Sequence, residues 1–490
     1  MDNYIITIDQ STSGTKVLLI NEQAQIVDKL QAAHEQIYPQ PGWVEHNPHE
    51  IYNTVVHLLN TIVEKHQLNK SNIHGLAITN QRETCLLWDK NGEALHHAIV
   101  WQCNRTASLC QQYIENGYEK FIEEKTGLKI SPYFSATKLI WLNMNCEKPE
   151  TTLAGTMDSW LIYKLTNHQV HATDYTNACR TLLFNIHSLQ WDEELLKLFQ
   201  LQQIQLPHVH YSDSCFGTLA DPKLSKHLQG VAIYGVIGDS QAALFSQCCF
   251  QKGDAKATLG TGTSVLMNVG TKPIATKDGI VSTIAWALSK DISYAIEGII
   301  YSTGDTISWA KEQLNLFSNY DELHQLLQKT FDAKGVIIIP AFHGLGAPYW
   351  SQHAKAAIFG ISRSTSKAHI LKACVDSIAL QINDVLHLME ILSNEPLRQL
   401  KCDGGGTNNR FTIQQIANIL QKNVDVNIST DLSPIGAAFI CGLAIDWWQK
   451  DTLKNFGMYS SYQPIIDNEK AQLSIAHWQN LVKHLQTIYD

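Results

Sequence analysis

The sequence predicts an α/β protein made of two similar halves, and three observations carry this prediction. Strand-like segments alternate with amphipathic helical segments along the 490 residues. A pattern of strand, Gly/Ser/Thr-rich tip and strand occurs twice, about half the chain apart. A third glycine-rich segment stands between a strand-like and a helical segment at residues 403–407. At roughly 100 to 200 residues per domain, the length allows two to four domains.

The first repeat is a hairpin at the start of the chain. An apolar strand from Tyr4 to Ile8 leads into a tip at residues 9–15 and then into a strand from Val17 to Ile20. Small and hydroxyl-bearing residues let such a tip bend sharply and present amides and hydroxyls to an anion. Taken alone, the tip could equally be an ordinary β-turn.

The second repeat has the same construction. A strand from Ala255 to Leu259 meets the tip Gly-Thr-Gly-Thr-Ser at residues 260–264, and a strand from Val265 to Asn268 follows. Because one such tip occurs in each half, we interpret the pair as phosphate-binding hairpins rather than as two unrelated turns.

The third segment, Asp403-Gly404-Gly405-Gly406-Thr407, follows a strand-like run from Leu397 to Cys402. An amphipathic helix is expected after it, and a second, longer helix begins near Ser366. Consecutive glycines at a strand-to-helix junction allow close approach to a nucleotide. The sequence contains neither a G-x-x-x-x-G-K-[ST] loop nor a G-x-G-x-x-G fingerprint after the first strand. Paired hairpins and a glycine loop are typical, by analogy, of two actin-like (ribonuclease-H-like) ATPase domains with an active-site cleft between them.

The composition limits the classes of partner that the protein can bind and the compartment in which it works. The formal net charge of −9 has the wrong sign for a general nucleic-acid or anionic-membrane binder, so we expect a small-molecule partner. The start of the chain does not resemble a signal peptide, and the longest apolar run, near residues 435–445, is too short to cross a membrane. Eleven cysteines without a C-x-x-C pair indicate reduced thiols. These features predict a cytoplasmic protein without stable membrane insertion.

Nine ordered segments resemble the FGGY family of carbohydrate kinases, and they extend from one end of the chain to the other. They are residues 9–12, 37–46 (IYPQPGWVEH), 78–84 (ITNQRET), 98–103 (AIVWQC), 132–135 (PYFS), 174–178 (DYTNA), 238–245 (GDSQAALF), 344–350 (GLGAPYW) and 403–405 (DGG). The resemblance implies two actin-like domains, which we divide into residues 1–246, for polyol binding and the first phosphate hairpin, and residues 247–490, for nucleotide binding. It also implies ATP-dependent phosphorylation of a polyol or sugar hydroxyl, Mg²⁺ as cofactor, and a homodimer or homotetramer.

Two aspartates are expected to carry the chemistry. The family's base falls on Asp239, at the end of the apolar strand from Val231 to Ile237, where a carboxylate can take the proton of the alcohol. A plain helix N-cap is the alternative for Asp239. Asp9 ends its strand beside the first tip and is expected to hold Mg²⁺, through water, next to the β- and γ-phosphates. A turn-stabilising role is its alternative.

The resemblance assigns the nucleotide contacts to both halves. Thr12, Ser13 and Thr261 are expected to donate to phosphate oxygens, and Lys16 stands where the family usually has Arg, which keeps the charge but not bidentate geometry. Further contacts are expected from Gly304, Gly405, Gly406 and Asn409. Arg410 stands where members of the family that act on glycerol generally have a second Asn.

The polyol contacts are expected from Arg82, Glu83, Tyr133 and Asp239, with Trp101 as an apolar wall. A polyol has hydroxyl edges and a C–H face, so charged partners and an aromatic plate suit it. Without the surrounding motifs, Arg82 and Glu83 would be read as a solvated surface pair and Trp101 as core.

Two departures bear on the substrate. Ser240 stands where members acting on glycerol usually have Gln, and Ser264 where they usually have an aromatic residue. Both changes would widen a pocket that they line, and Ser240 is itself expected to touch the substrate. Phosphorylation of glycerol to sn-glycerol 3-phosphate is therefore the first hypothesis, and a tetritol, pentitol or pentulose the second. An actin-like chaperone ATPase or nucleotide-sensing module is the alternative from another class.

Overall fold

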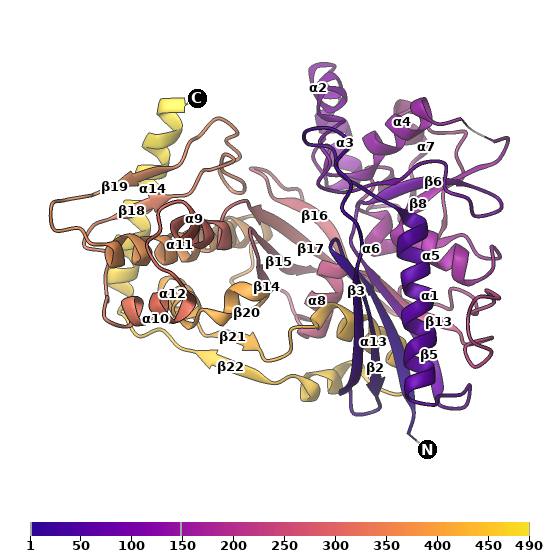
Figure 1. Cartoon of the computed structure of the whole chain (residues 1–490). Coiled ribbons are helices and arrows are strands. Elements are labelled where there is room, and N and C mark those ends of the chain that lie inside the picture. Colours follow the sequence, from indigo (N-terminus) through magenta and orange to yellow (C-terminus); the bar gives the residue numbers. More distant parts are fainter. Residues whose placement is uncertain (1, 148, 490) are drawn as a thin grey trace.

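The computed structural model describes residues 2–147 and 149–489 and has two lobes, each built around one mixed β-sheet (Figure 1). The N-terminal sheet has the order β13-β5-β1-β2-β3. Its strands are β1 (Tyr4–Gln10), β2 (Gly14–Asn21), β3 (Ile26–Ala33), β5 (Ile73–Asn80) and β13 (Ile233–Gly238).

The C-terminal sheet has the order β16-β17-β15-β14-β20-β21-β22. Its strands are β14 (Asp254–Leu259), β15 (Thr263–Gly270), β16 (Val281–Leu288), β17 (Asp291–Ile300), β20 (Gln399–Asp403), β21 (Val424–Asn427) and β22 (Tyr459–Tyr462).

The two sheets repeat one topology. In the N-terminal sheet, β1 pairs antiparallel with β2 and parallel with β5, and β3 and β13 lie outside them. In the C-terminal sheet, β14 pairs antiparallel with β15 and parallel with β20, and β17 and β21 lie outside them. The C-terminal sheet adds β16 and β22 at its two edges. The two hairpins predicted from the sequence are the first two strands of each sheet, β1–β2 and β14–β15. The predicted α/β class and the duplication are confirmed.

Side-chain alternation explains how the N-terminal sheet is covered. Ile6 and Ile8 on β1 pack with α1 (Pro48–Lys65) and α5 (Met157–Leu165), whereas Ile5 points to the other face. There it meets α8 (Asp239–Ser246) and α13 (Leu432–Ala444). The apolar run near residues 435–445 is thus a core helix. Across the described residues, no helix combines the length and apolar character that a membrane crossing requires.

Helix α13 crosses between the lobes, because it comes from the C-terminal half and packs against β1, β5, β13 and α8. Its apolar side chains share one buried cluster with Leu266 of β15 and Trp286 of β16. We keep residue 246, at the end of α8, as the proposed domain boundary; α13 joins the two sides of it. In Figure 1, β16 and β17 lie on the side of the C-terminal lobe that faces the N-terminal lobe.

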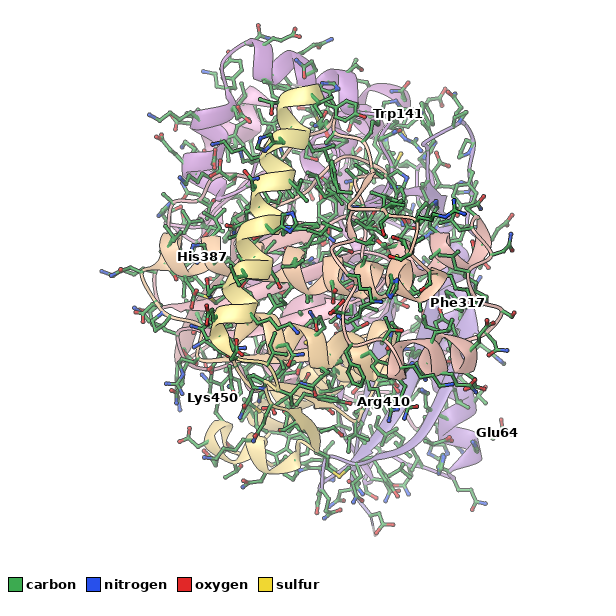
Figure 2. All side chains as sticks on the ribbon, turned by 90° about the vertical axis from the view of Figure 1, so that its left-hand side faces the viewer. Glu64, Trp141, Phe317, His387, Arg410 and Lys450 are labelled. Carbon is green, nitrogen blue, oxygen red and sulfur yellow. The ribbon has the colours of Figure 1, made fainter. Side chains whose placement is uncertain are left out.

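The C-terminal sheet is covered by α11 (Lys367–Ser393), which begins after the N-cap Ser366 as predicted, and by α12 (Arg410–Leu420). Helix α14 (Asn468–Tyr489) runs along the face turned away from the N-terminal lobe (Figure 2). The remaining helices are α2 (Ala107–Glu115), α3 (Glu119–Thr126), α4 (Ser135–Asn145), α6 (Tyr175–Ala178), α7 (Glu193–Leu198), α9 (Gly304–Glu312), α10 (Tyr320–Gln328) and the 3₁₀ segments η1 (Gly405–Asn408) and η2 (Lys450–Phe456).

Smaller sheets complete the lobes. A four-stranded sheet joins β4 (Glu45–His46), β7 (Ala98–Ile99), β6 (Cys85–Asp89) and β8 (Thr152–Thr156). Three strand pairs are β9 (Ala172–Asp174) with β12 (His208–His210), β10 (Phe184–Asn185) with β11 (Gln190–Trp191), and β18 (Ile337–Ile339) with β19 (Ala357–Phe359).

Candidate active site

A sharp turn after β5 carries Arg82 and Glu83 into the interior. Glu83 has φ of 62°, in the left-handed region, and Thr84 N donates to Arg82 O at 2.7 Å. This turn directs both side chains inward, and Arg82 is 5% exposed and Glu83 1%. The alternative interpretation of these two residues as a solvated surface pair is therefore wrong.

Arg82 and Glu83 belong to a cluster of four buried charges. Arg82 Nη2 lies 2.9 Å from Glu297 Oε1, and Arg180 Nε donates to Glu83 Oε1 at 2.6 Å. Arg180 Nη2 lies 2.8 Å from Glu297 Oε2. Burial opposes ionisation, but Arg180 and Arg82 outweigh it and lower the pKa of Glu297 to about 2. The cluster is balanced, with two guanidinium groups and two carboxylates.

Asp239 is the first residue of α8 and faces this cluster. Arg82 Nε lies 3.4 Å from Asp239 Oδ1, and the Asp239 side chain is 35% exposed. The N-cap position is occupied by Gly238, so the capping alternative for Asp239 is wrong. Ser433 Oγ donates to the Asp239 carbonyl at 2.9 Å, which ties the start of α8 to α13. Ser240 follows and is half-buried. Asp239 is thus a carboxylate that solvent and a ligand can reach, beside a fixed guanidinium.

Two aromatic rings lie next to these charges. The rings of Trp101 and Tyr133 meet edge to face with centroids 5.5 Å apart. The ammonium of Lys138, on α4, donates to the backbone carbonyls of residues 132–134 and thereby holds the turn that carries Tyr133. Burial, with the nearby charge of Glu83, raises the pKa of Tyr133, so its hydroxyl stays protonated and can donate.

The first hairpin tip contacts this aromatic pair. Trp101 Nε1 donates to Thr12 Oγ1 at 2.9 Å, and Gln36 Nε2 donates to the Thr12 carbonyl at 2.9 Å. Ser13, at the apex of the tip, is exposed. The predicted phosphate hairpin and the predicted polyol wall are therefore in direct contact.

Asp9 lies at the base of the same hairpin, opposite Lys16. Lys16 Nζ is 3.5 Å from Asp9 Oδ2 and 2.9 Å from Asp431 Oδ1. Burial raises the pKa of Asp9 to about 6, Lys16 opposes this shift, and the charges of Asp239 and Asp431 add to it. Asp9 thus lies beside Lys16 and near Asp431, which comes from the C-terminal half of the chain and also pairs with Lys29.

Asp9 by itself is a candidate to hold a hydrated cation that is shared with a phosphate. In residues 2–147 and 149–489, no set of three or more His, Cys, Asp or Glu side chains could by itself hold a metal ion. Mg²⁺ commonly binds one or two carboxylates and completes its coordination with phosphate oxygens and water. A single buried carboxylate such as Asp9 fits that mode and does not fit a metal cage made of protein alone.

The C-terminal lobe contains a cavity of about 570 Å³, and the residues predicted there to bind the nucleotide line it. It is lined by Thr261, Gly304, Gly405, Gly406 and Asn409, together with Tyr320 and His324 of α10. The strand-to-helix pattern predicts an α-helix directly after the glycine run, and this is wrong. The run leads into the 3₁₀ turn η1, and α12 begins only after it. Asn409 Oδ1 caps α12 by accepting from Phe411 N, and the Arg410 guanidinium lies over the Phe411 ring.

Several site residues escaped prediction from the sequence. Arg180, Glu297 and Lys138 are each buried, and each is a single charge inside an otherwise apolar or uncharged stretch. That pattern is a usable signal, because a charge at a buried position needs a partner. Tyr320, which is exposed, and His324, which is half-buried, carry no such signal, because aromatic residues at such positions on a helix have many explanations.

Comparison with known proteins matches two family models to this chain. Residues 4–246 match the N-terminal domain of the FGGY family of carbohydrate kinases, and residues 255–445 match its C-terminal domain. The chain belongs to the FGGY family of carbohydrate kinases. The predicted family, its two-domain actin-like fold and an enzyme of the kinase class are thereby confirmed.

Relatives within the family extend over the whole chain. A glycerol kinase of Brevibacillus brevis is 42% identical over 98% of both chains, and glycerol kinase 2 of Thermotoga maritima is 41% identical over 98% of both. The structure of Plasmodium falciparum glycerol kinase with ADP superposes with a TM-score of 0.93 at 33% identity, and covers 99% of this chain and 98% of that one. A gluconate kinase of Lactobacillus acidophilus shares the fold at 20% identity, with a TM-score of 0.89.

Proposed function

We propose that this chain transfers the γ-phosphoryl group of ATP to a primary hydroxyl of glycerol and forms sn-glycerol 3-phosphate. The observation that carries the proposal is the joint placement of Arg82, Asp239 and Tyr133 beside Trp101, whose indole bonds to the tip of the first hairpin. Its full-length relatives of about 40% identity are glycerol kinases.

In the proposed site, Arg82 and Glu83 bind hydroxyls of the polyol, and Trp101 covers its C–H face. Tyr133 supplies a protonated hydroxyl as a further donor. Asp239 accepts the proton of the attacking hydroxyl and orients its oxygen toward the phosphorus. A weakly basic carboxylate suits phosphoryl transfer, because the loose transition state demands little deprotonation before bond formation.

The nucleotide is proposed to lie across the lobes. Gly304, Gly405, Gly406 and Asn409 line the cavity for its nucleoside end, while Thr261, Thr12 and Ser13 donate to phosphate oxygens. Lys16 compensates phosphate charge at the base of the hairpin. Mg²⁺, held at Asp9, would neutralise charge on the β- and γ-phosphate oxygens.

A second substrate class has one specific observation in its favour. Ser264 Oγ donates to Glu297 Oε1 at 3.0 Å, at the position where members of the family that act on glycerol usually have an aromatic residue. Together with Ser240, this small residue favours a roomier site for a tetritol, pentitol or pentulose.

An ADP-release assay tests the proposal with glycerol, erythritol, xylitol, xylulose and ribulose as acceptors. We expect the highest kcat/KM for glycerol. Strong turnover of a pentulose with little turnover of glycerol would replace glycerol by the second class. A rate of ATP hydrolysis that none of these compounds changes, but that a polypeptide changes, would support a chaperone ATPase.

A further inference from the structure

A glutamate of the C-terminal lobe is inserted among the polyol-site residues of the N-terminal lobe. Glu297 stands in the middle of β17, between apolar neighbours, and is fully buried. Its carboxylate contacts Arg82, Arg180 and Ser264, of which the first two come from the other lobe. Arg82 and Arg180 of the N-terminal lobe are therefore linked to the C-terminal sheet by ionic contacts with Glu297.

Glu297 binds both terminal nitrogens of the Arg82 guanidinium, and Gln241 Oε1 also accepts from Nη1 at 3.2 Å. Arg82 Nη2 donates to Glu297 Oε1 at 2.9 Å and Nη1 to Glu297 Oε2 at 3.3 Å, a bidentate pair. Because the guanidinium is planar and rigid, fixing both Nη atoms also fixes Nε, which lies 3.4 Å from Asp239 Oδ1. Glu83 holds Arg82 more weakly, with 3.9 Å between Arg82 Nε and Glu83 Oε1.

The same strand leads to the nucleotide cavity. Strand β17 pairs with β15, which leaves the second hairpin tip. Just after β17, Thr303 N donates to Thr261 O at 3.0 Å and Gly304 N donates to Gly260 O at 3.1 Å. The partner of Arg82 lies on β17, and the backbone that supports the second phosphate tip follows directly after this strand.

We propose that Glu297 is a positioning residue for polyol binding: supplied by the nucleotide-binding lobe, it orients Arg82 toward the polyol and toward Asp239. The proposal rests on the proposed function. It follows that the polyol site is complete only when β17 is packed against the N-terminal lobe as it is here. The low pKa of Glu297, about 2, agrees with a carboxylate that stays ionised throughout the working pH range.

The test compares Glu297→Gln, Glu297→Asp and the wild-type enzyme in steady-state kinetics with glycerol and with ATP. In Glu297→Gln, we expect the KM for glycerol to rise by about 30-fold or more, because a buried charge pair loses one partner. The KM for ATP should change by less than about twofold. Glu297→Asp keeps the charge but shortens the side chain, and we expect a smaller rise confined to glycerol.

Stability is measured alongside by thermal melting, and nucleotide binding by titration with ADP. If Glu297→Gln does not fold, Glu297→Asp carries the same comparison of the two KM values. An equal rise in both KM values, or an unchanged KM for glycerol in a folded variant, would overturn the positioning role. Failure of the wild-type enzyme to phosphorylate glycerol would instead refute the proposed function, so the two failures are distinguishable.

Discussion

The indole Nε1 of Trp101 donates a 2.9 Å hydrogen bond to Oγ1 of Thr12, and this contact joins the expected polyol wall to the expected phosphate loop. The donor and the acceptor are 89 residues apart in the sequence. Because the Thr12 oxygen accepts from the indole, its proton stays available for a phosphate oxygen. A single side-chain pair can therefore align the acceptor with the phosphoryl donor.

Replacement of Trp101 by Phe should disturb both substrates. Trp101→Phe keeps an aromatic face but removes the donor, and a hydrogen bond of this kind contributes about 1 kcal/mol. We expect kcat/KM to fall by about fivefold for both glycerol and ATP. Thr12→Val also removes the hydroxyl that is proposed to donate to a phosphate oxygen, so its loss should be larger. The double variant should lose less than the product of the two single losses, as a double-mutant cycle would measure. Fully multiplicative effects would contradict the coupling.

Replacement of Asp239 by Asn should remove the base. We expect kcat to fall by about 10² to 10⁴-fold, the usual contribution of a positioned base, while ADP binding measured by calorimetry stays unchanged. The control is Asp321→Asn, which alters an exposed aspartate in the first turn of α10 and should leave kcat unaffected. Unaltered turnover in Asp239→Asn would exclude Asp239 as the base.

A methyl group at Gly405 should act on the nucleotide alone. A Cβ there would meet no atom of the described chain within 4 Å, although Gly405 lines the nucleotide cavity. We expect Gly405→Ala to keep its melting temperature and to raise the KM for ATP by about tenfold, because the methyl occupies space that the ligand needs.

Gly304→Ala is the contrasting variant. A Cβ at Gly304 would lie 2.3 Å from the Gly260 carbonyl oxygen, so the second hairpin tip would have to move. We expect Gly304→Ala to lower both the melting temperature and the affinity for ATP. A Gly405→Ala enzyme with unchanged KM for ATP would place the nucleotide elsewhere.

His46 should make the folded state sensitive to acid. Its Nε2 lies 2.9 Å from Gln36 Oε1 and its Nδ1 lies 3.2 Å from Gln81 Nε2, which together select the neutral ring protonated at Nε2. Burial, with the adjacent His34, lowers the pKa of His46 from 6.5 to about 3. Because the folded pKa is depressed, the unfolded state binds more protons below pH 6.5. The stabilisation is therefore complete above pH 6.5 and is lost as the pH falls toward 3.

Denaturant titrations between pH 7 and pH 4.5 measure this effect. Below pH 6, the free energy of unfolding should fall by about 1.4 kcal/mol more per pH unit in the wild-type protein than in His46→Gln. Glutamine can still donate to Gln36 and accept from Gln81, so both forms should fold. Parallel pH profiles for the two proteins would show that His46 titrates normally in the folded state.

Much of the fold and part of the site were predictable from local patterns. The hairpins, the strand before Asp239 and the helix after Ser366 depend on apolar periodicity and turn residues, which are properties of neighbouring positions. The 3₁₀ turn after Gly404 was not predicted, because glycine runs are compatible with several backbone conformations.

The sequence by itself determined the duplicated α/β plan, the resemblance to a kinase family and most of the residue types at the site. Only the tertiary structure decided that Arg82 and Glu83 are buried, that Glu297 reaches them from the other lobe, and that Trp101 bonds to Thr12. The reason is physical: a charge is stable in the interior only beside a partner, and these partners are brought together by the packing of two sheets. Spacing along the chain carries no information about that packing.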